Sequence, residues 1–221
     1  MITAKNIQKH YLLSGEKIQV LKDVSLEIGD GEFVSIIGRS GSGKTTLLNV
    51  LSTLVQPDEG QLWYNDRSLV SKDSVPLNEL RQRDFAMIFQ FHHLLPYLSV
   101  LQNTLLPFMR SVTPVPQKIV ERAKGCLYRI GLGDKLDRLP GNLSGGEQQR
   151  VAIARAMVKS AKVMFADEPT GSLDKKTGEE IMNLLKELND DGLTVVMVTH
   201  EPQYAKRAER QIELSDGRVA S

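Results

Sequence analysis

The chain has 221 residues, a length that suits one large domain or one domain with a modest insert. Its 41% hydrophobic and 25% charged residues are ordinary for a soluble globular protein. The formal net charge is +1, so no global basicity favours a nucleic-acid partner. Cys126 is the single cysteine, which excludes a disulfide framework and favours a reducing compartment.

The first residues, MITAKNIQKHY, lack the apolar core of a signal peptide. No segment approaches the ~18 uninterrupted apolar residues of a membrane-spanning helix. We therefore expect a cytosolic chain unless another protein holds it at a membrane.

Predicted strands and helices alternate along the first ninety residues, with strands at 25–28, 32–38, 60–64 and 85–90 and a helix at 44–54. From about Phe91 to Arg138, apolar residues recur at helical spacing and are interrupted by prolines. A second amphipathic segment runs from Gln117 to Ile130. This pattern predicts a helical insert, about 91–160, within a single domain spanning 1–221.

After the insert the alternation resumes, with strands at 162–167 and 193–200, helices at 175–190 and 201–209, and a closing hairpin at 210–220. Apolar runs such as VMFA and VVMV would bury both faces of a strand, which is typical of a parallel sheet. The fold class is therefore α/β, with helices on both faces of a mainly parallel sheet.

GRSGSGKTT, from Gly38 to Thr46, matches the phosphate-binding pattern G-x-x-x-x-G-K-[ST] between a predicted strand and a helix. Its glycines let backbone N–H groups converge on phosphate oxygens at a helix N-terminus. Lys44 is expected to reach the β- and γ-phosphates and Thr45 to ligate Mg²⁺. The other nucleotide-binding candidates in this loop are Ser40, Gly41, Ser42 and Gly43.

Three further predicted strands end in polar residues that parallel pairing would bring to the same sheet edge. Asp167 is expected to hold Mg²⁺ opposite Thr45, and Glu168 to face an attacking water. The pair could equally form a helix N-cap region in DEPTGSLD. His200 and Gln90 are less specific, since a lone histidine or amide is usually structural; their shared placement favours a role at the site.

A second glycine-containing turn opens NLSGGEQQRVAIARA, which begins at Asn142. Ser144 and Glu147 predict a capping box, which alone accounts for the start of a helix. Gly145 and Gly146, however, cost about 1 kcal/mol each relative to alanine within a helix. We interpret the pair as a close approach by an anion, either a separate one or the nucleotide of a second copy.

Taken together, GRSGSGKTT, Gln90, LSGGEQQR, VMFADEP, GSLD and His200 closely resemble the ATP-binding subunit of ABC transporters, across essentially the whole chain. The resemblance implies an ATPase cassette with an N-terminal antiparallel β subdomain, using ATP and Mg²⁺ as a homodimer. In that arrangement Ser144, Gly145 and Gly146 would contact the γ-phosphate bound by the opposite subunit.

The same resemblance assigns roles to other positions. Glu168 would be the catalytic carboxylate, His200 would hold the γ-phosphate, and Gln90 would link Mg²⁺ and water to the membrane partner. Asp174 would communicate across the dimer interface, and Tyr11 would stack on adenine, although a tyrosine at a strand end is as often simple packing.

FHHLLPYLSVLQNTLLPF and ADEPTGSLD resemble the subgroup of lipoprotein-releasing, macrolide-exporting, heme-exporting and cell-division cassettes. This implies an integral-membrane permease as partner, a peripheral position on the cytoplasmic face of the membrane, and export of a hydrophobic or amphipathic substrate. The alternative is a regulatory cassette that signals without transport. DNA-repair and translation cassettes are disfavoured, because no heptad array separates Lys44 from Asp167 and only one cassette is present.

Overall fold

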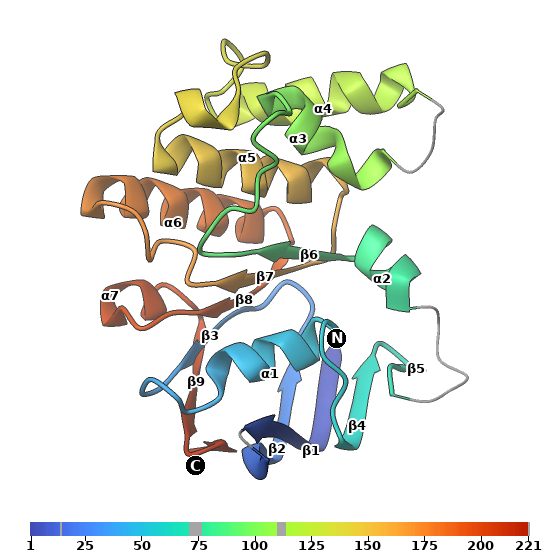
Figure 1. The fold of residues 1–221 in the computed structure, drawn as a ribbon, viewed down its shortest axis with the longest axis vertical. Helices are drawn as coiled ribbons and strands as arrows, with labels where there is room; N and C mark the ends of the chain where they lie inside the picture. Colours follow the sequence, from blue (N-terminus) through green and yellow to red (C-terminus); the bar gives the residue numbers. More distant parts are fainter. Residues whose placement is uncertain (14, 71–76, 110–113, 221) are drawn as a thin grey trace.

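The computed structural model describes residues 1–13, 15–70, 77–109 and 114–220. In Figure 1 an antiparallel sheet lies at the bottom, a mainly parallel sheet in the middle and a group of helices at the top. The antiparallel sheet has the order β2-β1-β4-β5, formed by β1 (Ile2–Leu13), β2 (Glu16–Ile28), β4 (Glu59–Tyr64) and β5 (Arg67–Ser68).

The second sheet has the order β10-β9-β3-β8-β7-β6, with every pair parallel except β10 with β9. Its strands are β3 (Phe33–Ile37), β6 (Phe85–Ile88), β7 (Val163–Asp167), β8 (Thr194–Val198), β9 (Arg210–Ser215) and β10 (Arg218–Val219). The predicted α/β class with a mainly parallel core sheet is therefore confirmed. Since β3, β7, β8 and β6 run in the same direction, their carboxyl ends meet at one edge.

The predicted hairpin at the end of the chain is confirmed. Asp216 and Gly217, with φ of 47° and 79°, connect β9 to β10 in the left-handed conformation that a tight hairpin turn requires.

The long β1–β2 hairpin was not predicted as such. Asn6 and Asp23 adopt φ of 52° and 65°, and the pairing register shifts on either side of Ile7. These bulges interrupt the alternation of buried and exposed side chains by which a strand is recognised.

The parallel sheet has a hydrophobic core on each face. Side chains such as Val34, Phe165 and Val196 pack on one face with α1 (Lys44–Leu51) and the antiparallel sheet. Their chain neighbours, such as Phe33 and Met164, pack on the other face with α5 (Gly145–Val158) and α6 (Lys175–Asp190). Strands buried on both faces explain the continuous apolar runs in the sequence.

The segment between β6 and β7 contains the helices α3 (Val100–Leu105), η1 (Leu106–Phe108), α4 (Gln117–Arg129), η2 (Pro140–Asn142) and α5. Leu105, Ala123 and Val158 form a small separate core among them. The remaining helices are α2 (Leu77–Arg83) and α7 (Pro202–Ala205). Within the described residues, no helix has the length and apolarity that crossing a bilayer would require.

Candidate nucleotide-binding site

The loop between β3 and α1 has the backbone geometry that its glycines permit. Gly43 is the N-cap of α1 with φ of 100°, and Gly38 has φ of 146°. A side chain on Gly38 would approach the backbone oxygen of Leu214 to less than 3.0 Å, and one on Gly43 would lie 3.0 Å from the backbone oxygen of Val20. Both positions therefore require glycine, for conformation and for space.

Two remote segments hold this loop from outside. The backbone N–H of Gly217, in the β9–β10 turn, donates to the carbonyl of Ser42 at 3.1 Å. The Gly217 carbonyl in turn accepts from the N–H of Lys22, on β2, at 2.7 Å. The phosphate-binding loop is thus fixed between the first hairpin of the chain and the last.

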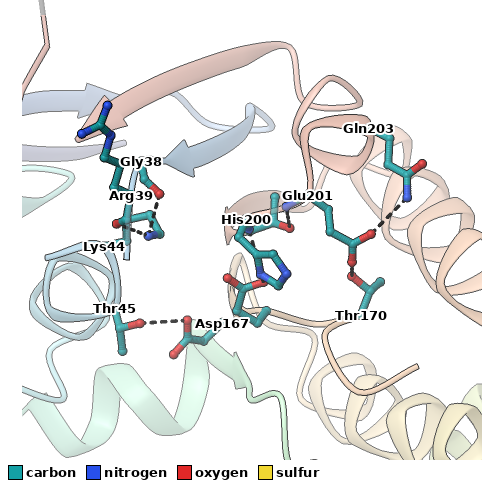
Figure 2. A network of polar contacts seen from close by, with 11 residues as sticks. Gly38, Arg39, Lys44, Thr45, Asp167, Thr170, His200, Glu201 and Gln203 are labelled. Carbon is teal, nitrogen blue, oxygen red and sulfur yellow. Dashed lines mark hydrogen bonds and ion pairs between the residues drawn. The ribbon is translucent and has the colours of Figure 1, made fainter. Parts of the chain in front are cut away.

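Two polar side chains of the loop are hydrogen-bonded within the chain, and Figure 2 shows them, Lys44 and Thr45. Lys44 Nζ donates to the carbonyls of Gly38 and Arg39, at 2.9 Å each. The buried Ser42 hydroxyl has no hydrogen-bond partner within the described chain. Ser40 and Gly41 are exposed, and Thr46 is half-buried. A cation and an unsatisfied hydroxyl beside a helix N-terminus fit a phosphate group.

Thr45 and Asp167 lie together although 122 residues separate them. The Thr45 hydroxyl donates to Asp167 Oδ1 at 3.2 Å, joining the start of α1 to the end of β7. Burial raises the pKa of Asp167; the neighbouring Glu168 acts in the same direction, while the Thr45 hydrogen bond and Lys44 oppose it. A hydroxyl and a carboxylate are oxygen ligands that suit a hard divalent cation, whose charge would favour the ionised form of Asp167.

Glu168 and His200 lie within hydrogen-bonding distance at the same sheet edge. Glu168 Oε2 lies 2.8 Å from His200 Nδ1 and accepts from the His200 N–H at 3.3 Å. The Glu168 side chain is 18% exposed and that of His200 65%. Because an ionised carboxylate only accepts, Nδ1 carries the proton in this contact; in a neutral ring Nε2 is then an acceptor.

Glu168 has φ of 48°, in the left-handed region that residues other than glycine rarely adopt. Its N–H bonds to the carbonyl of Val198, at the end of β8. The strained backbone turns the Glu168 side chain away from the strand line that ends in Asp167. Asp167 and Glu168 therefore face different groups, Thr45 and His200.

Gln90 lies two residues beyond the end of β6, and His200 two residues beyond the end of β8, rather than at the strand termini predicted from the sequence. The Gln90 amide nitrogen lies beside Gly171, where an added side chain would meet it at 2.9 Å and Glu168 Cβ at 3.4 Å. The Ser172 hydroxyl donates to the Gln90 carbonyl at 3.2 Å. Gln90 thus lies near Glu168, and no hydrogen bond of the described chain joins its amide to Asp167.

Tyr11 lies on β1 opposite Ile18 and is 41% exposed, with the Lys9 ammonium 5.7 Å from the centre of its ring. β2 continues from Ile18 to Val20, whose carbonyl flanks Gly43. The exposed ring therefore belongs to the hairpin that borders the phosphate-binding loop.

The second glycine turn forms the predicted capping box. Ser144 Oγ accepts from the Glu147 N–H at 3.3 Å, and Glu147 Oε2 accepts from the Ser144 N–H at 2.9 Å. The pKa of Glu147 lies below its usual range, mainly because Lys135 donates a hydrogen bond to the carboxylate and secondly because the Ser144 N–H does so too. No hydrogen bond or ion pair in the described chain joins Ser144, Gly145 or Gly146 to residues 38–46.

Gly146 has a packing reason within the chain. An added Cβ would lie less than 3.0 Å from Thr177 Cγ2, on α6. Thr177 is held in place by Asp174, the N-cap of α6, which accepts from its N–H at 3.1 Å and its hydroxyl at 2.5 Å. These two hydrogen bonds lower the pKa of Asp174, and the bond from the Thr177 hydroxyl contributes most. Gly145 is less constrained, with Leu173 Cδ2 at 3.3 Å.

Two residues of α5 that the sequence did not single out connect this helix to the rest of the site. Arg155 donates to the carbonyls of His92 at 2.9 Å and His93 at 3.2 Å, just after Gln90. Gln149, fully buried, donates to the carbonyl of Pro169 at 2.8 Å. Burial lowers the pKa of Arg155. The sequence could have drawn attention to these two polar side chains because they lie in a helix rich in alanine, valine and isoleucine. It gives no indication of the carbonyls to which they donate.

These features define a P-loop nucleotide-binding domain in which a hydroxyl–carboxylate pair lies next to a carboxylate–histidine pair. Residues 21–171 match the family model "ABC transporter", and the chain belongs to this family. The lipoprotein-releasing system ATP-binding protein LolD of Syntrophus aciditrophicus is 42% identical over 222 residues, covering all of this chain and 99% of LolD.

The macrolide export ATP-binding/permease protein MacB of Bartonella quintana is 44% identical over 219 residues. It covers 99% of this chain, which spans only about a third (33%) of the length of MacB. Among solved structures, the dimeric ATP-binding cassette MJ0796 in a post-hydrolysis state with ADP and Pi has a TM-score of 0.89 and 43% identity, covering 100% of this chain and 97% of that one. The predicted ABC ATPase cassette is thus confirmed as the class of this protein.

Proposed function

We propose that this chain is the ATP-hydrolysing subunit of a membrane exporter and couples its ATP cycle to the export of a hydrophobic or amphipathic substrate. The observation that carries the proposal is the Thr45–Asp167 bond beside the Glu168–His200 pair, at the carboxyl edge of one parallel sheet. LolD and MacB are described as lipoprotein-releasing and macrolide-export proteins, which supports a substrate of the lipoprotein or macrolide type; heme and peptide types rest on the sequence resemblance alone.

ATP would be held by the loop from Gly38 to Thr46, with Lys44 on the β- and γ-phosphates and Tyr11 on the adenine. Thr45 and Gln90 would ligate Mg²⁺, with Asp167 behind Thr45. When bound, Mg²⁺ neutralises charge on the phosphate oxygens. The partnerless Ser42 hydroxyl and the contact between Thr45 and Asp167 support this set.

Glu168 would accept the proton of the attacking water as the bond between the β–γ bridging oxygen and the γ-phosphorus breaks. One of its oxygens is already engaged by His200 Nδ1, which leaves the other to face the water. With this contact kept, His200 can donate from Nε2 to a γ-phosphate oxygen only as an imidazolium. If the ring stays neutral, the contact with Glu168 has to open and the proton has to move to Nε2.

A second copy of the chain would complete the site. The turn at Ser144 presents a helix N-terminus that no hydrogen bond or ion pair of the described residues joins to the chain's own phosphate loop, and the similar cassette MJ0796 is dimeric. In a head-to-tail pair, Ser144, Gly145 and Gly146 would bind the γ-phosphate held by the partner. Asp174, at the start of α6, would lie at the same interface.

An integral-membrane permease would hold the cassette at the cytoplasmic face of the membrane as a peripheral subunit. The segment after Gln90 supports this, because it exposes large apolar side chains: Phe91 is 73% exposed and Tyr97 75%. Large apolar side chains exposed within one short segment favour an interaction site there. The same contact would bring permease movements to Gln90 and, through Arg155, to α5.

Replacement of Glu168 by glutamine tests the dimer and the catalytic role together. We expect the variant to bind MgATP, to hydrolyse it at least about a hundredfold more slowly, and to elute as a dimer in size-exclusion chromatography with saturating MgATP. Lys44→Ala, which removes the phosphate-binding cation, is the matched control and should stay monomeric. An E168Q variant that remains a monomer with saturating MgATP would contradict the two-copy site.

The transport role is tested by purification from membranes of the native host, followed by insertion of the purified complex into vesicles. We expect a membrane permease to copurify and the complex to move a substrate across the vesicle membrane in an ATP-dependent way. Copurification without any transport by the complex in vesicles would favour the regulatory alternative instead.

A further inference from the structure

A groove of about 620 Å³ lies far from the phosphate-binding loop, between α4, the end of α5 and the loop from α6 to β8. It opens at the start of β7, near Lys162 and Met164, whereas Asp167 and the nucleotide site lie at the other end of the same strand. None of the residues assigned above to ATP, Mg²⁺ or the dimer lines it. Its volume is in the range of sites that hold small organic molecules.

The floor of the groove is apolar. It is formed by side chains from α5, β7, α6 and the loop before β8, namely Ala156, Met157, Met164, Leu188 and Leu193. Methionine side chains adapt easily to an apolar ligand of irregular shape.

One face of α4 forms the wall, with Arg122, Gly125, Cys126 and Arg129 at the spacing that places residues on the same side of a helix. Gly125 is an interior helix position, where glycine costs up to about 1 kcal/mol relative to alanine. No heavy atom of the described residues beyond its chain neighbours and its own helix backbone lies within 4 Å of the Cβ position there. Packing within the part of the chain that the structure describes therefore does not explain the glycine, which leaves the groove open beside Cys126.

The rim is cationic. Arg122, Arg129 and Lys162 contribute three positive charges and Asp191 one negative charge, a local balance of 3 − 1 = +2 in a chain whose total is +1. Arg129 is paired with Asp191 at 2.6 Å. Arg122 contacts only neutral groups in the described chain, the Ser160 hydroxyl at 3.3 Å and the ring of Phe108. Neither Arg122 nor Lys162 has a carboxylate partner among the described residues.

We propose that this groove binds a small amphipathic anion, with its apolar chain on the methionine- and leucine-lined floor and its carboxylate or phosphate beside Arg122 and Lys162. An apolar floor alone would suit any hydrophobic molecule, but the excess of two positive charges selects for an anionic head group. This site is independent of the nucleotide-binding loop and of the dimer proposed above.

Burial raises the pKa of the Cys126 thiol, with Arg122 and Arg129 opposing, which agrees with a thiol in an apolar wall next to two cations. As the only cysteine of the chain, Cys126 reports on the groove. The experiment measures the rate of Cys126 labelling by an aromatic disulfide reagent while sodium decanoate is titrated below its micellar range. Decanoate at about ten times its Kd should slow labelling about tenfold, because only the unbound fraction reacts.

Three comparisons separate charge, chain and groove. Butyrate, which has the charge without the long chain, and decyltrimethylammonium, which has the chain with the opposite charge, should not protect Cys126. Decanoate affinity, measured by calorimetry, should fall about fivefold in Arg122→Gln and be lost in Gly125→Leu, which fills the groove. Arg138→Gln, an exposed arginine that does not line the groove, controls for net charge.

Equal protection by decanoate and decyltrimethylammonium would mean unspecific adsorption and would overturn the proposal. So would decanoate binding that is unchanged in both Arg122→Gln and Gly125→Leu. If Cys126 is protected without decanoate and more so at higher protein concentration, a second copy covers the groove and the assignment of a small anion is wrong. MgATP binding by Gly125→Leu should equal that of the wild type, so failure here is distinguishable from failure of the proposed ATPase function.

Discussion

The pair Gly146 and Thr177 allows a test of why the second glycine turn contains its glycines. Replacing Gly146 by alanine adds a Cβ less than 3.0 Å from Thr177 Cγ2 and 3.5 Å from Thr177 Cβ, where the bonds to Asp174 prevent the threonine from turning away. Overpacking of this kind costs about 1–3 kcal/mol, and the better helix propensity of alanine returns up to about 1 kcal/mol. We expect a net loss of about 1–2 kcal/mol.

Thr177→Ser is the matched partner, since serine keeps the hydroxyl that bonds to Asp174 and lacks the clashing methyl group. In the Thr177→Ser background, Gly146→Ala should be neutral or stabilising, so the effect of one substitution changes sign with the other. For a domain of this size each kcal/mol corresponds to about 2–4 °C in Tm. Thermal unfolding of the four proteins, wild type, both single variants and the double variant, measures this coupling.

ATPase activity of the same four proteins separates packing from nucleotide contact. If a second copy's ATP approaches Gly146, the double variant should regain stability without regaining hydrolysis. An equal Tm for wild type and Gly146→Ala would refute the packing reasoning. Full recovery of both stability and hydrolysis in the double variant would refute the need for a bare backbone at Gly146.

Two further predictions concern α5 and its cap. Arg155→Met should lower stability by about 1–3 kcal/mol and reduce kcat more than ATP affinity, because the carbonyls of His92 and His93, just after Gln90, lose their donor. Arg155→Lys should have an intermediate effect. An unchanged Tm and kcat in Arg155→Met would contradict this role of Arg155. The lowered pKa of Glu147 means that its ionised form stabilises the fold above the ordinary carboxyl pKa of about 4.3 and that this contribution is lost as pH falls through the folded value. The Tm difference between wild type and Glu147→Gln should therefore be present at pH 7 and shrink below about pH 4; an equal difference at pH 7 and pH 3 would contradict the cause assigned.

Patterns that depend on nearby residues could be predicted well from the sequence. The helix predicted at 175–190 is α6 with the same bounds, because Asp174 caps it and its apolar face repeats at helical spacing. The buried parallel strands followed from their continuous apolar runs. β1 and the first part of β2 were missed because the conformations of Asn6 on β1 and Asp23 on β2 break the alternation of each strand, and no residue type predicts a bulge.

Contacts with backbone atoms could not be predicted. Arg155 and Gln149 donate to backbone carbonyls of His92, His93 and Pro169. Because every residue has a backbone carbonyl, the residue types in the sequence do not indicate which carbonyl is the partner. The reason for Gly146 was equally hidden, because its neighbour Thr177 is 31 residues away on another helix. By contrast, Thr45 and Asp167 could be paired in advance, because parallel strands bring their carboxyl ends to a common edge.

The attachment of the phosphate-binding loop to both β2 and the β9–β10 turn affects how the protein can be handled. The Ser42 carbonyl accepts from the N–H of Gly217, so a chain cleaved just before Asp216 would lose this bond and the partly buried Val219 but keep every fully buried residue of both cores and every residue assigned to ATP. Such a shortened protein would still fold cooperatively while its affinity for nucleotide fell. A weak ATPase measured on a clipped chain would then report damage near the end of the polypeptide, with the catalytic residues themselves intact.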